Sequence, residues 1–322
     1  MKICVLGAGG FIGHHLVKRL KNDLHFVRGY DLKKPEFEAS PADVFHVADL
    51  RDPFEAMEAL SGCERVYHLA ANMGGIGYIE FHKAEIVRDN TVIDINVLEA
   101  ARQCGVKRML FTSSACAYPV HIQESVYAAP LREEEAYPAA PEDGYGWEKL
   151  YMERMCRHWR EDWDLNTCVA RLHNAYGPLG TYDGGREKSP AAICRKVALA
   201  QDGGDIEVWG DGKQSRTFCY IDDAVEALIR VMDSNFSEPI NVGTDELVTI
   251  DELVDMVAGI AGKTLKKIYK LAAAQGVRGR NCDISKFRRL YGWAPSTPLK
   301  VGIEKTYRWI ESELKKTGRI KY

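Results

Sequence analysis

Short apolar runs alternate with longer amphipathic segments along the first half of the chain. Apolar runs of about 4–8 residues are typical of buried strands, and apolar residues spaced three and four apart are typical of helices. The pattern predicts strands at 2–7, 25–30, 44–49, 65–71, 108–114 and 167–172, with helices at 11–20, 53–60, 84–104 and 143–162. This alternation predicts an α/β protein with a doubly wound parallel sheet, the Rossmann architecture.

The pattern loosens after residue 173, where glycine- and proline-rich loops separate shorter segments. We expect strands at 206–209, 216–221 and 239–242, and helices at 190–199, from 221 to about 232, at 250–261 and at 299–315. The strand at 239–242 should return to the large sheet. The expected domains are therefore interleaved: 1–173 plus about 217–245 form the larger one, and about 174–216 plus 246–322 form a smaller C-terminal substrate lobe.

A glycine-rich turn, Gly7-Ala8-Gly9-Gly10-Phe11-Ile12-Gly13, joins the first strand to the first helix. Glycines at this place allow a tight turn, close approach of the backbone to a pyrophosphate, and close packing of helix on sheet. The second strand leads into Asp31, whose carboxylate can accept hydrogen bonds from the ribose hydroxyls of adenosine. The carboxylate would also repel a 2′-phosphate, so the motif predicts NAD rather than NADP.

Ligands of a parallel sheet bind beyond the carboxyl ends of its strands. We therefore expect residues at the ends of the third and fourth strands to line the cofactor cleft, namely Asp49, His68, Leu69, Ala70 and Ala71. The cofactor-binding residues expected in the glycine turn are Gly7, Gly10, Phe11, Ile12 and Gly13.

Tyr145 and Lys149 are one helical turn apart, so both side chains lie on one helix face. A phenol has a pKa of about 10, and an ammonium group and a cationic nicotinamide nearby are expected to lower it. Tyr145 is then a candidate acid/base for a hydroxyl proton while a hydride leaves the same carbon. Most such pairs are merely exposed helix residues, but the glycine motif and Ser114, at the end of a strand, favour the catalytic interpretation.

The net charge of −3 gives no support for binding to nucleic acid or to an anionic membrane. No apolar segment approaches the length needed to span a membrane, and the first strand begins at the N-terminus, where a signal peptide would lie. The nine cysteines lack the spacing of a zinc site. They are typical of reduced thiols in a cytoplasmic protein, and we expect no metal.

The glycine motif, Asp31, Ser114, Tyr145 and Lys149 together resemble the extended short-chain dehydrogenase/reductase family, in its nucleotide-sugar branch. The similarity covers essentially the whole chain, including the segments 171–178 and 220–225. Within that branch, longer segments are similar to the GDP-mannose 3,5-epimerases; these segments are 72–77, 113–119, 184–188, 191–196 and 276–281.

The resemblance implies an isomerase that interconverts GDP-D-mannose and GDP-L-galactose, with GDP-L-gulose as a product changed at C5 alone. Oxidation at C4 makes the protons on C3 and C5 acidic, because each carbanion delocalises into the ketone. By resemblance, Tyr145 moves the C4 hydroxyl proton, Ser114 holds the same oxygen, and Lys149 tunes Tyr145 and binds the nicotinamide ribose. Cys116 and Lys188 would be the acid/base pair for C3 and C5.

Cys116 and Lys188 each have a plainer interpretation. A cysteine after a buried strand is more often a packing residue, and a loop lysine is usually solvated. Cys116 lies two residues after Ser114, and the acidic pair that sugar 4,6-dehydratases carry aligns with Ala115 and Cys116. Since no carboxylate is present there, a thiolate activated by nearby cations becomes the candidate base.

The resemblance also implies a set of substrate-binding residues: Met73, Gly74, Gly75, Ser114, Asn174, Glu187, Lys188, Lys196, Gln214, Arg216, Arg278 and Arg280. The basic residues Lys196, Arg216, Arg278 and Arg280 are the candidates for the diphosphate. Alternatives stay open at several positions. Any one cation could form an exposed ion pair, Met73 could be packing, and Glu187 could orient Lys188 or bind a sugar hydroxyl.

Members of this family commonly pair two long helices across a homodimer, so the helices at 84–104 and 143–162 are the expected interface. Their apolar residues could equally pack against their own sheet; these are Ile93, Ile95, Val97, Leu98, Leu150, Met152 and Met155. Two other functions remain open. The chain could be another nucleotide-sugar epimerase or reductase, or a catalytically silent protein that binds NAD and a nucleotide sugar.

Overall fold

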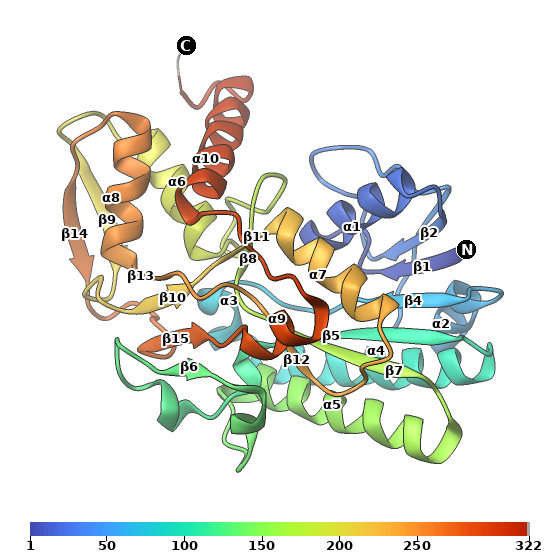
Figure 1. Ribbon diagram of the computed structural model, residues 1–322. Helices are drawn as coiled ribbons and strands as arrows, with labels where there is room; N and C mark the ends of the chain where they lie inside the picture. The colour runs from blue at the N-terminus through green and yellow to red at the C-terminus, as the bar shows by residue number, and fades with distance from the viewer. Residues whose placement is uncertain (321–322) are drawn as a thin grey trace.

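The computed structural model describes residues 1–320, in which a seven-stranded parallel sheet forms the centre (Figure 1). Its strand order is β12-β7-β5-β4-β1-β2-β3. The strands are β1 (Lys2–Leu6), β2 (Phe26–Asp31), β3 (Val44–Val47), β4 (Arg65–His68), β5 (Arg108–Ser114), β7 (Thr167–Leu172) and β12 (Ile240–Val242). The order reverses between β1 and β4, which places a ligand crevice at the carboxyl ends of these two strands. The predicted fold class is confirmed.

Helices cover both faces of the sheet. One face carries α1 (Phe11–Asn22) and α7 (Ile221–Asp233), and the other carries α2 (Pro53–Leu60), α4 (Lys83–Gln103) and α5 (Asp143–Trp163), as Figure 1 shows. The helices at 11–20, 53–60, 84–104 and 143–162 were therefore predicted to within a few residues. Their apolar faces fill two separate cores, one on each side of the sheet.

Most of the apolar residues expected at a dimer interface lie instead in the interior of the chain. The buried ones are Ile93, Val97, Leu98, Leu150, Met152 and Met155. Of the seven, Ile95 alone is exposed. The intramolecular alternative is thus correct for these six residues: five lie in the core where α4 and α5 pack on each other and on the sheet, and Leu150 packs in a separate cluster with Tyr118 and Leu131.

The segments after β7, together with residues 130–131, build smaller sheets and three packed helices. The helices are α6 (Ser189–Leu199), α8 (Ile250–Ala261) and α10 (Leu299–Lys316), close to the predicted bounds. A four-stranded sheet joins β13 (Leu247–Thr249), β10 (Ser215–Thr217), β15 (Gly279–Cys282) and β6 (Pro130–Leu131). Two-stranded sheets pair β14 (Lys266–Lys270) with β9 (Asp205–Trp209), and β11 (Cys219–Tyr220) with β8 (Ala175–Tyr176).

Several predicted bounds differ from the structure. The strand at 65–71 ends at His68, the strand at 44–49 ends at Val47, and the segment 216–221 divides into β10, β11 and the start of α7. The helices α3 (Ile76–Phe81) and α9 (Ser285–Tyr291) were not predicted. The expected lobe range 246–322 extends beyond the described residues at 321–322. Within residues 1–320, no helix has the length and apolarity that a membrane span requires.

Candidate active site

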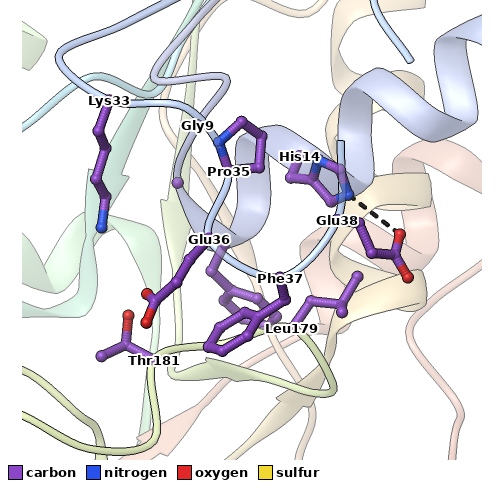
Figure 2. Close-up of a pocket in the computed structure, with 11 residues that line it drawn as sticks. Gly9, His14, Lys33, Pro35, Glu36, Phe37, Glu38, Leu179 and Thr181 are labelled. Atoms are coloured by element: carbon purple, nitrogen blue, oxygen red, sulfur yellow. Dashed lines mark hydrogen bonds and ion pairs between the residues drawn. The ribbon is translucent and has the colours of Figure 1, made fainter. Parts of the chain in front are cut away.

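The glycine turn lies where β1 passes into α1, and its backbone is packed too closely for side chains. A Cβ atom on Gly9 would lie 2.0 Å from the carbonyl oxygen of Lys33, and one on Gly13 would lie 2.0 Å from that of Gly7. Gly7 has φ +84, in the left-handed region that favours glycine. Figure 2 shows the pocket beside this turn, which residues 33–38 and the chain near Leu179 enclose. Glycines are thus required by the close packing of this turn against the chain after β2 and against α1, which begins directly after the turn, at Phe11.

Asp31 is the last residue of β2, and its carboxylate is fixed against the glycine turn. Its oxygens accept hydrogen bonds from the backbone N–H of Gly9 (2.9 Å) and of Lys33 (3.1 Å). Burial raises the pKa of Asp31, while these N–H groups act to lower it. Residues 69–71 approach from the neighbouring strand, since a Cβ on Gly7 would lie 2.8 Å from the nitrogen of Ala70. The arrangement of turn, acid and strand end fits an adenine dinucleotide.

The two other polar residues expected in the cofactor cleft have partners of their own. Both carboxylate oxygens of Asp49 accept from Arg51, over 2.7 to 3.0 Å. His68 does not line the cleft: its side chain is buried, and Nε2 lies 2.8 Å from Oδ1 of Asp94. That expectation was wrong because the side chain of His68 points to the face of the sheet that α4 covers.

Tyr145 and Lys149 project from the first turns of α5 toward the end of β5. Both are nearly inaccessible to solvent, and the Nζ atom of Lys149 lies 5.7 Å from the centre of the Tyr145 ring. Burial raises the pKa of Tyr145, against the lowering effects of Lys149 and of a hydrogen bond with Ser114. The expected decrease depended on Lys149 and a cationic nicotinamide together; in the protein by itself, the cost of burying a phenolate exceeds the attraction of the ammonium group.

Cys116 lies in the short helix η1 (Ala115–Ala117) that follows β5, directly against α5. Close contact of the two elements needs a glycine, since a Cβ on Gly146 would lie 2.3 Å from the carbonyl oxygen of Cys116. The thiol accepts a hydrogen bond from Nη1 of Arg280 at 3.4 Å. Cys116 and Tyr145 line one cavity of about 310 Å³ together with Glu142 and Gln275.

Lys188 precedes α6 and completes this group of charges. Burial lowers its pKa; Cys116 acts in the opposite direction, and Arg280 adds to the decrease. The guanidinium of Arg280 is also held by Gln123 (2.7 Å) and by Glu142 (2.8 Å). A thiol beside one guanidinium and one amine of lowered pKa is suited to exchanging a proton.

The four cations expected at the diphosphate have different surroundings. Arg278 makes a two-pronged ion pair with Asp211, and Lys196 pairs with Glu207 at 3.3 Å. Arg216 donates to the carbonyl oxygens of residues 215, 275 and 277, and burial together with the charge of Arg280 lowers its pKa to about 10. Arg280 faces Cys116, as described above. Lys196 and Arg278 are therefore already paired with carboxylates, unlike Arg216.

The predicted substrate residues Asn174, Glu187 and Gln214 lie on loops and are not among the residues that line the cavity. Asn174 has φ +43 and donates to the carbonyl oxygen of Thr217, while the Oε1 atom of Gln214 is buried without a hydrogen-bond donor. The carboxylate of Glu187 accepts from Arg195 at 3.0 Å and from the N–H of Gly185 at 2.7 Å. Glu187 is thus paired with Arg195 and not with Lys188.

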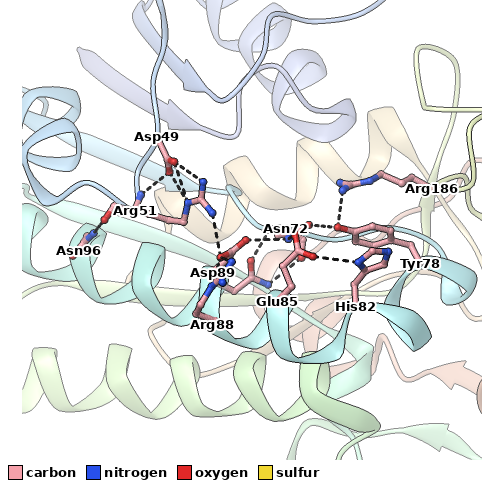
Figure 3. A network of polar contacts seen from close by, with 11 residues as sticks. Asp49, Arg51, Asn72, Tyr78, His82, Glu85, Arg88, Asp89, Asn96 and Arg186 are labelled. Carbon is pink, nitrogen blue, oxygen red and sulfur yellow. Dashed lines mark hydrogen bonds and ion pairs between the residues drawn. The ribbon is translucent and has the colours of Figure 1, made fainter.

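The loop at 72–77, which includes Met73 and Gly74, packs directly on the loop that carries Lys188. A Cβ on Gly75 would lie 2.3 Å from the carbonyl oxygen of Glu187, and the N–H of Gly75 donates to the carbonyl of Arg186 at 3.0 Å. Figure 3 shows the polar contacts that extend from this junction to the cofactor side, through Arg186, Tyr78, Asn72, Asp89, Arg51 and Asp49.

Sequence reasoning missed the acidic residues around the candidate catalytic groups: Glu142, which holds Arg280, and the buried pair Asp94 and Glu148. Glu148 had a signal, since it lies inside the Tyr145–Lys149 motif. Glu142 had none, because an acidic residue before a helix is common for electrostatic reasons alone. Within residues 1–320, no group of three or more His, Cys, Asp or Glu side chains is placed to hold a metal ion.

Residues 3–243 match the model of the NAD dependent epimerase/dehydratase family. The chain belongs to this family. NAD is accordingly its cofactor, and the residues around the glycine turn and Asp31 fit that group.

Within the NAD-dependent epimerase/dehydratase family, the chain is 43% identical over 318 residues to GDP-mannose 3,5-epimerase of Arabidopsis thaliana, a match that covers 98% of this chain and 84% of the relative. It is 42% identical to GDP-mannose 3,5-epimerase 1 of Oryza sativa subsp. japonica, over 98% and 83%. Among solved structures, UDP-glucose 4-epimerase with UDP-glucose from Thermotoga maritima superimposes with a TM-score of 0.87 at 26% identity, over 98% of this chain and 100% of that one. The complex of UDP-glucose 4-epimerase with NAD from Thermus thermophilus gives 0.82 at 26% identity, over 96% and 99%.

Proposed function

We propose that this chain is an NAD-dependent isomerase that epimerises GDP-D-mannose at C3 and C5 to GDP-L-galactose, with GDP-L-gulose as a C5-only product. The observation that carries the proposal is the cavity that Cys116 and Tyr145 share, with Arg280 against the thiol and Lys188 close by. The similarity to plant enzymes of that name, over nearly the whole chain, supports the same substrate.

NAD supplies a reversible hydride acceptor for C4 of the sugar. The Gly7–Gly13 turn would hold its pyrophosphate, Asp31 its adenosine ribose, and Lys149 its nicotinamide ribose. Tyr145 removes the proton of the C4 hydroxyl, and Ser114 holds the same oxygen by a hydrogen bond. Because burial raises the pKa of Tyr145, its deprotonated form depends on positive charge close by.

The C4 ketone lets a proton leave C5 or C3, because the electron pair of the broken C–H bond moves into the ketone as an enolate. Cys116 and Lys188 would act on opposite faces of the sugar ring, one removing a proton and the other delivering one. The guanidinium of Arg280 donates a hydrogen bond to the thiol over 3.4 Å and holds it at the cavity. The cycle ends with C4 reduced again, so no net oxidation occurs.

We propose that the substrate diphosphate lies against Arg216 on β10 and Arg278, which directly precedes β15, together with Lys196. Arg216 supports this assignment best, since its donated hydrogen bonds go to carbonyl oxygens. Residues 1–173 plus about 217–245 would bind NAD, and about 174–216 plus 246–322 would bind the nucleotide sugar. The remaining substrate contacts would come from Met73, Gly74, Gly75, Asn174, Glu187 and Gln214.

We also propose a homodimer formed through α4 and α5, in a cytoplasmic protein. Each helix has an exposed apolar stripe: Val92 and Ile95 on α4, and Trp147 and Tyr151 on α5, the last two 51% and 56% exposed. Residues of this kind, spaced three and four apart, form one face of a helix. All nine cysteines are free thiols, which suits a reducing compartment. Light scattering that gave a 36.2 kDa particle at micromolar concentration would contradict the dimer.

Incubation with GDP-mannose in deuterated water tests the function. We expect deuterium at C3 and C5 of the recovered sugar. Incorporation at C5 alone would indicate a narrower enzyme, and incorporation with another nucleotide sugar but not with GDP-mannose would indicate another epimerase of the family. If no nucleotide sugar acquires deuterium while NAD and GDP-mannose still bind, the chain is a silent binding protein.

A further inference from the structure

A cluster of ionisable side chains lies directly behind Tyr145, shielded from solvent. It consists of His68 at the end of β4, Asp94 on α4, and Glu148 and Lys149 on α5. Asp94 is 2% exposed and Glu148 is 4% exposed. If both buried carboxyl groups were ionised beside one lysine, one negative charge would be unpaired. An unpaired buried charge is costly, so the protonation state of the two groups has to be assigned.

The hydrogen bonds of the cluster leave one proton to be assigned. His68 Nε2 lies 2.8 Å from Oδ1 of Asp94, and Asn90 donates to Oε2 of Glu148 at 3.3 Å. Lys149 Nζ lies 3.2 Å from Oε1 of Glu148. Oδ2 of Asp94 is buried without a hydrogen-bond donor, although the two carboxyl groups are within hydrogen-bonding reach of each other. Since an ionised carboxylate can only accept, a proton on one carboxyl group is needed to join them.

The charge balance gives the same result. Burial raises the pKa of Glu148 to about 8, with Lys149 opposing and Asp94 adding to the increase. Burial also raises the pKa of Asp94, and it lowers the pKa of His68 to about 3, so this imidazole is neutral. Burial acts to lower the pKa of Lys149, but the acidic pair raises it overall. One proton on the pair therefore leaves a single negative charge against the ammonium of Lys149.

We propose that Asp94 and Glu148 share one proton, and that Glu148 is a positioning residue: its protonation removes one of the two negative charges that would otherwise oppose Lys149 beside Tyr145. The second half of this statement rests on the proposed function, in which Tyr145 moves the C4 hydroxyl proton. The two carboxyl groups keep this proton throughout the catalytic cycle. When Glu148 ionises, its charge raises the pKa of Tyr145 and opposes deprotonation of the phenol.

The remaining titratable groups near the pair do not change this assignment. Tyr145 lies on the same helix as Glu148, and the thiol of Cys156 faces Asp94 from α5. Burial raises the pKa of each, so both are neutral at neutral pH. The ammonium group of Lys149 is thus the positive charge that the pair balances.

Infrared spectroscopy at neutral pH tests the shared proton directly, because a protonated carboxyl group has a carbonyl stretch that a carboxylate lacks. We expect this band in the wild-type protein and its loss in E148Q and in D94N. The matched control is D89N on the same helix: Asp89 pairs with Arg88 at 2.7 Å and with Arg51 at 3.2 Å, so its carboxylate is ionised and the band should remain.

A wild-type spectrum without the band, or an unchanged band in E148Q, would overturn the proposal. If D94N does not fold, E148Q decides against its control: the band must be lost in E148Q and remain in D89N. The measurement needs neither NAD nor a sugar, so its failure would leave the proposed function standing. Failure of the proposed function would likewise leave the shared proton standing.

The pH dependence of hydride transfer tests the effect on Tyr145. Glu148 has a raised pKa, so it is neutral below about pH 8 and ionises above it, where we expect the wild-type rate to decline. In E148Q the side chain stays neutral, so this decline should shift upward by about 1 pH unit or more. A purely structural role would reduce the rate of E148Q by the same factor at every pH and leave the profile unshifted.

Discussion

Replacing Cys116 with alanine separates the proposed proton exchange from the redox step. The substitution removes the thiol that accepts from Arg280, while the hydrogen bonds of Arg280 to Gln123 and Glu142 remain and keep the guanidinium in place. Tyr145, Ser114 and Lys149 are untouched, so C4 should still be oxidised. General acid/base groups contribute about 10²–10⁴-fold to a rate, so deuterium exchange at C5 should slow by that factor.

The assay measures two signals on the same protein. Exchange at C5 and C3 is followed by mass spectrometry, and NADH absorbance reports C4 oxidation. The matched control is Cys194→Ala, at a fully buried position of α6. That variant should be less stable, by about 1 kcal/mol for one lost core group, with exchange unchanged. If Cys116→Ala exchanged deuterium at C5 as fast as the wild type, the thiol would be a packing residue and another group would be the base.

Three further outcomes check the cofactor site, the redox step and the loop junction. Asp31→Ala should weaken NAD binding by roughly 1.5–3 kcal/mol, the value of hydrogen bonds to a charged group, and should reduce discrimination against NADP; equal NAD affinity in calorimetry on cofactor-stripped protein would remove Asp31 from the site. Tyr145→Phe should give neither NADH absorbance nor deuterium exchange, and any transient NADH in that variant would assign the C4 proton to a different group. Gly75→Ala should impair epimerisation but not NAD binding, because the new methyl group would lie 2.3 Å from the carbonyl oxygen of Glu187 and displace the loop that carries Lys188. The control Gly259→Ala, whose methyl group meets no atom within 4 Å, should leave epimerisation unchanged. Equal turnover in the two variants would show that the junction does not position Lys188.

Local sequence patterns determined the fold class and most of the large elements. The helices α2 and α8 and the strands β5 and β7 have the predicted bounds, because each carries a complete apolar face or an uninterrupted apolar run. The glycine turn and Asp31 were also identifiable, since the geometry that a pyrophosphate needs restricts the residues at consecutive positions. Tyr145 was identified from its spacing to Lys149, whereas Cys116 and Lys188 were found by resemblance, which depends on segments several residues long.

The small sheets and the electrostatics were decided by tertiary contacts. β15 pairs with β10 and β6, which are far from it in the sequence. Strands as short as these form through such long-range pairing, so a local sequence pattern does not predict them. Arg280 and Cys116 are 164 positions apart, and the sequence suggested a phosphate contact for Arg280 rather than a thiol. The direction of the Tyr145 pKa shift depends on the exclusion of water from the phenol, and so does the proton between Asp94 and Glu148. These side chains lose their contact with water only when the chain has folded around them.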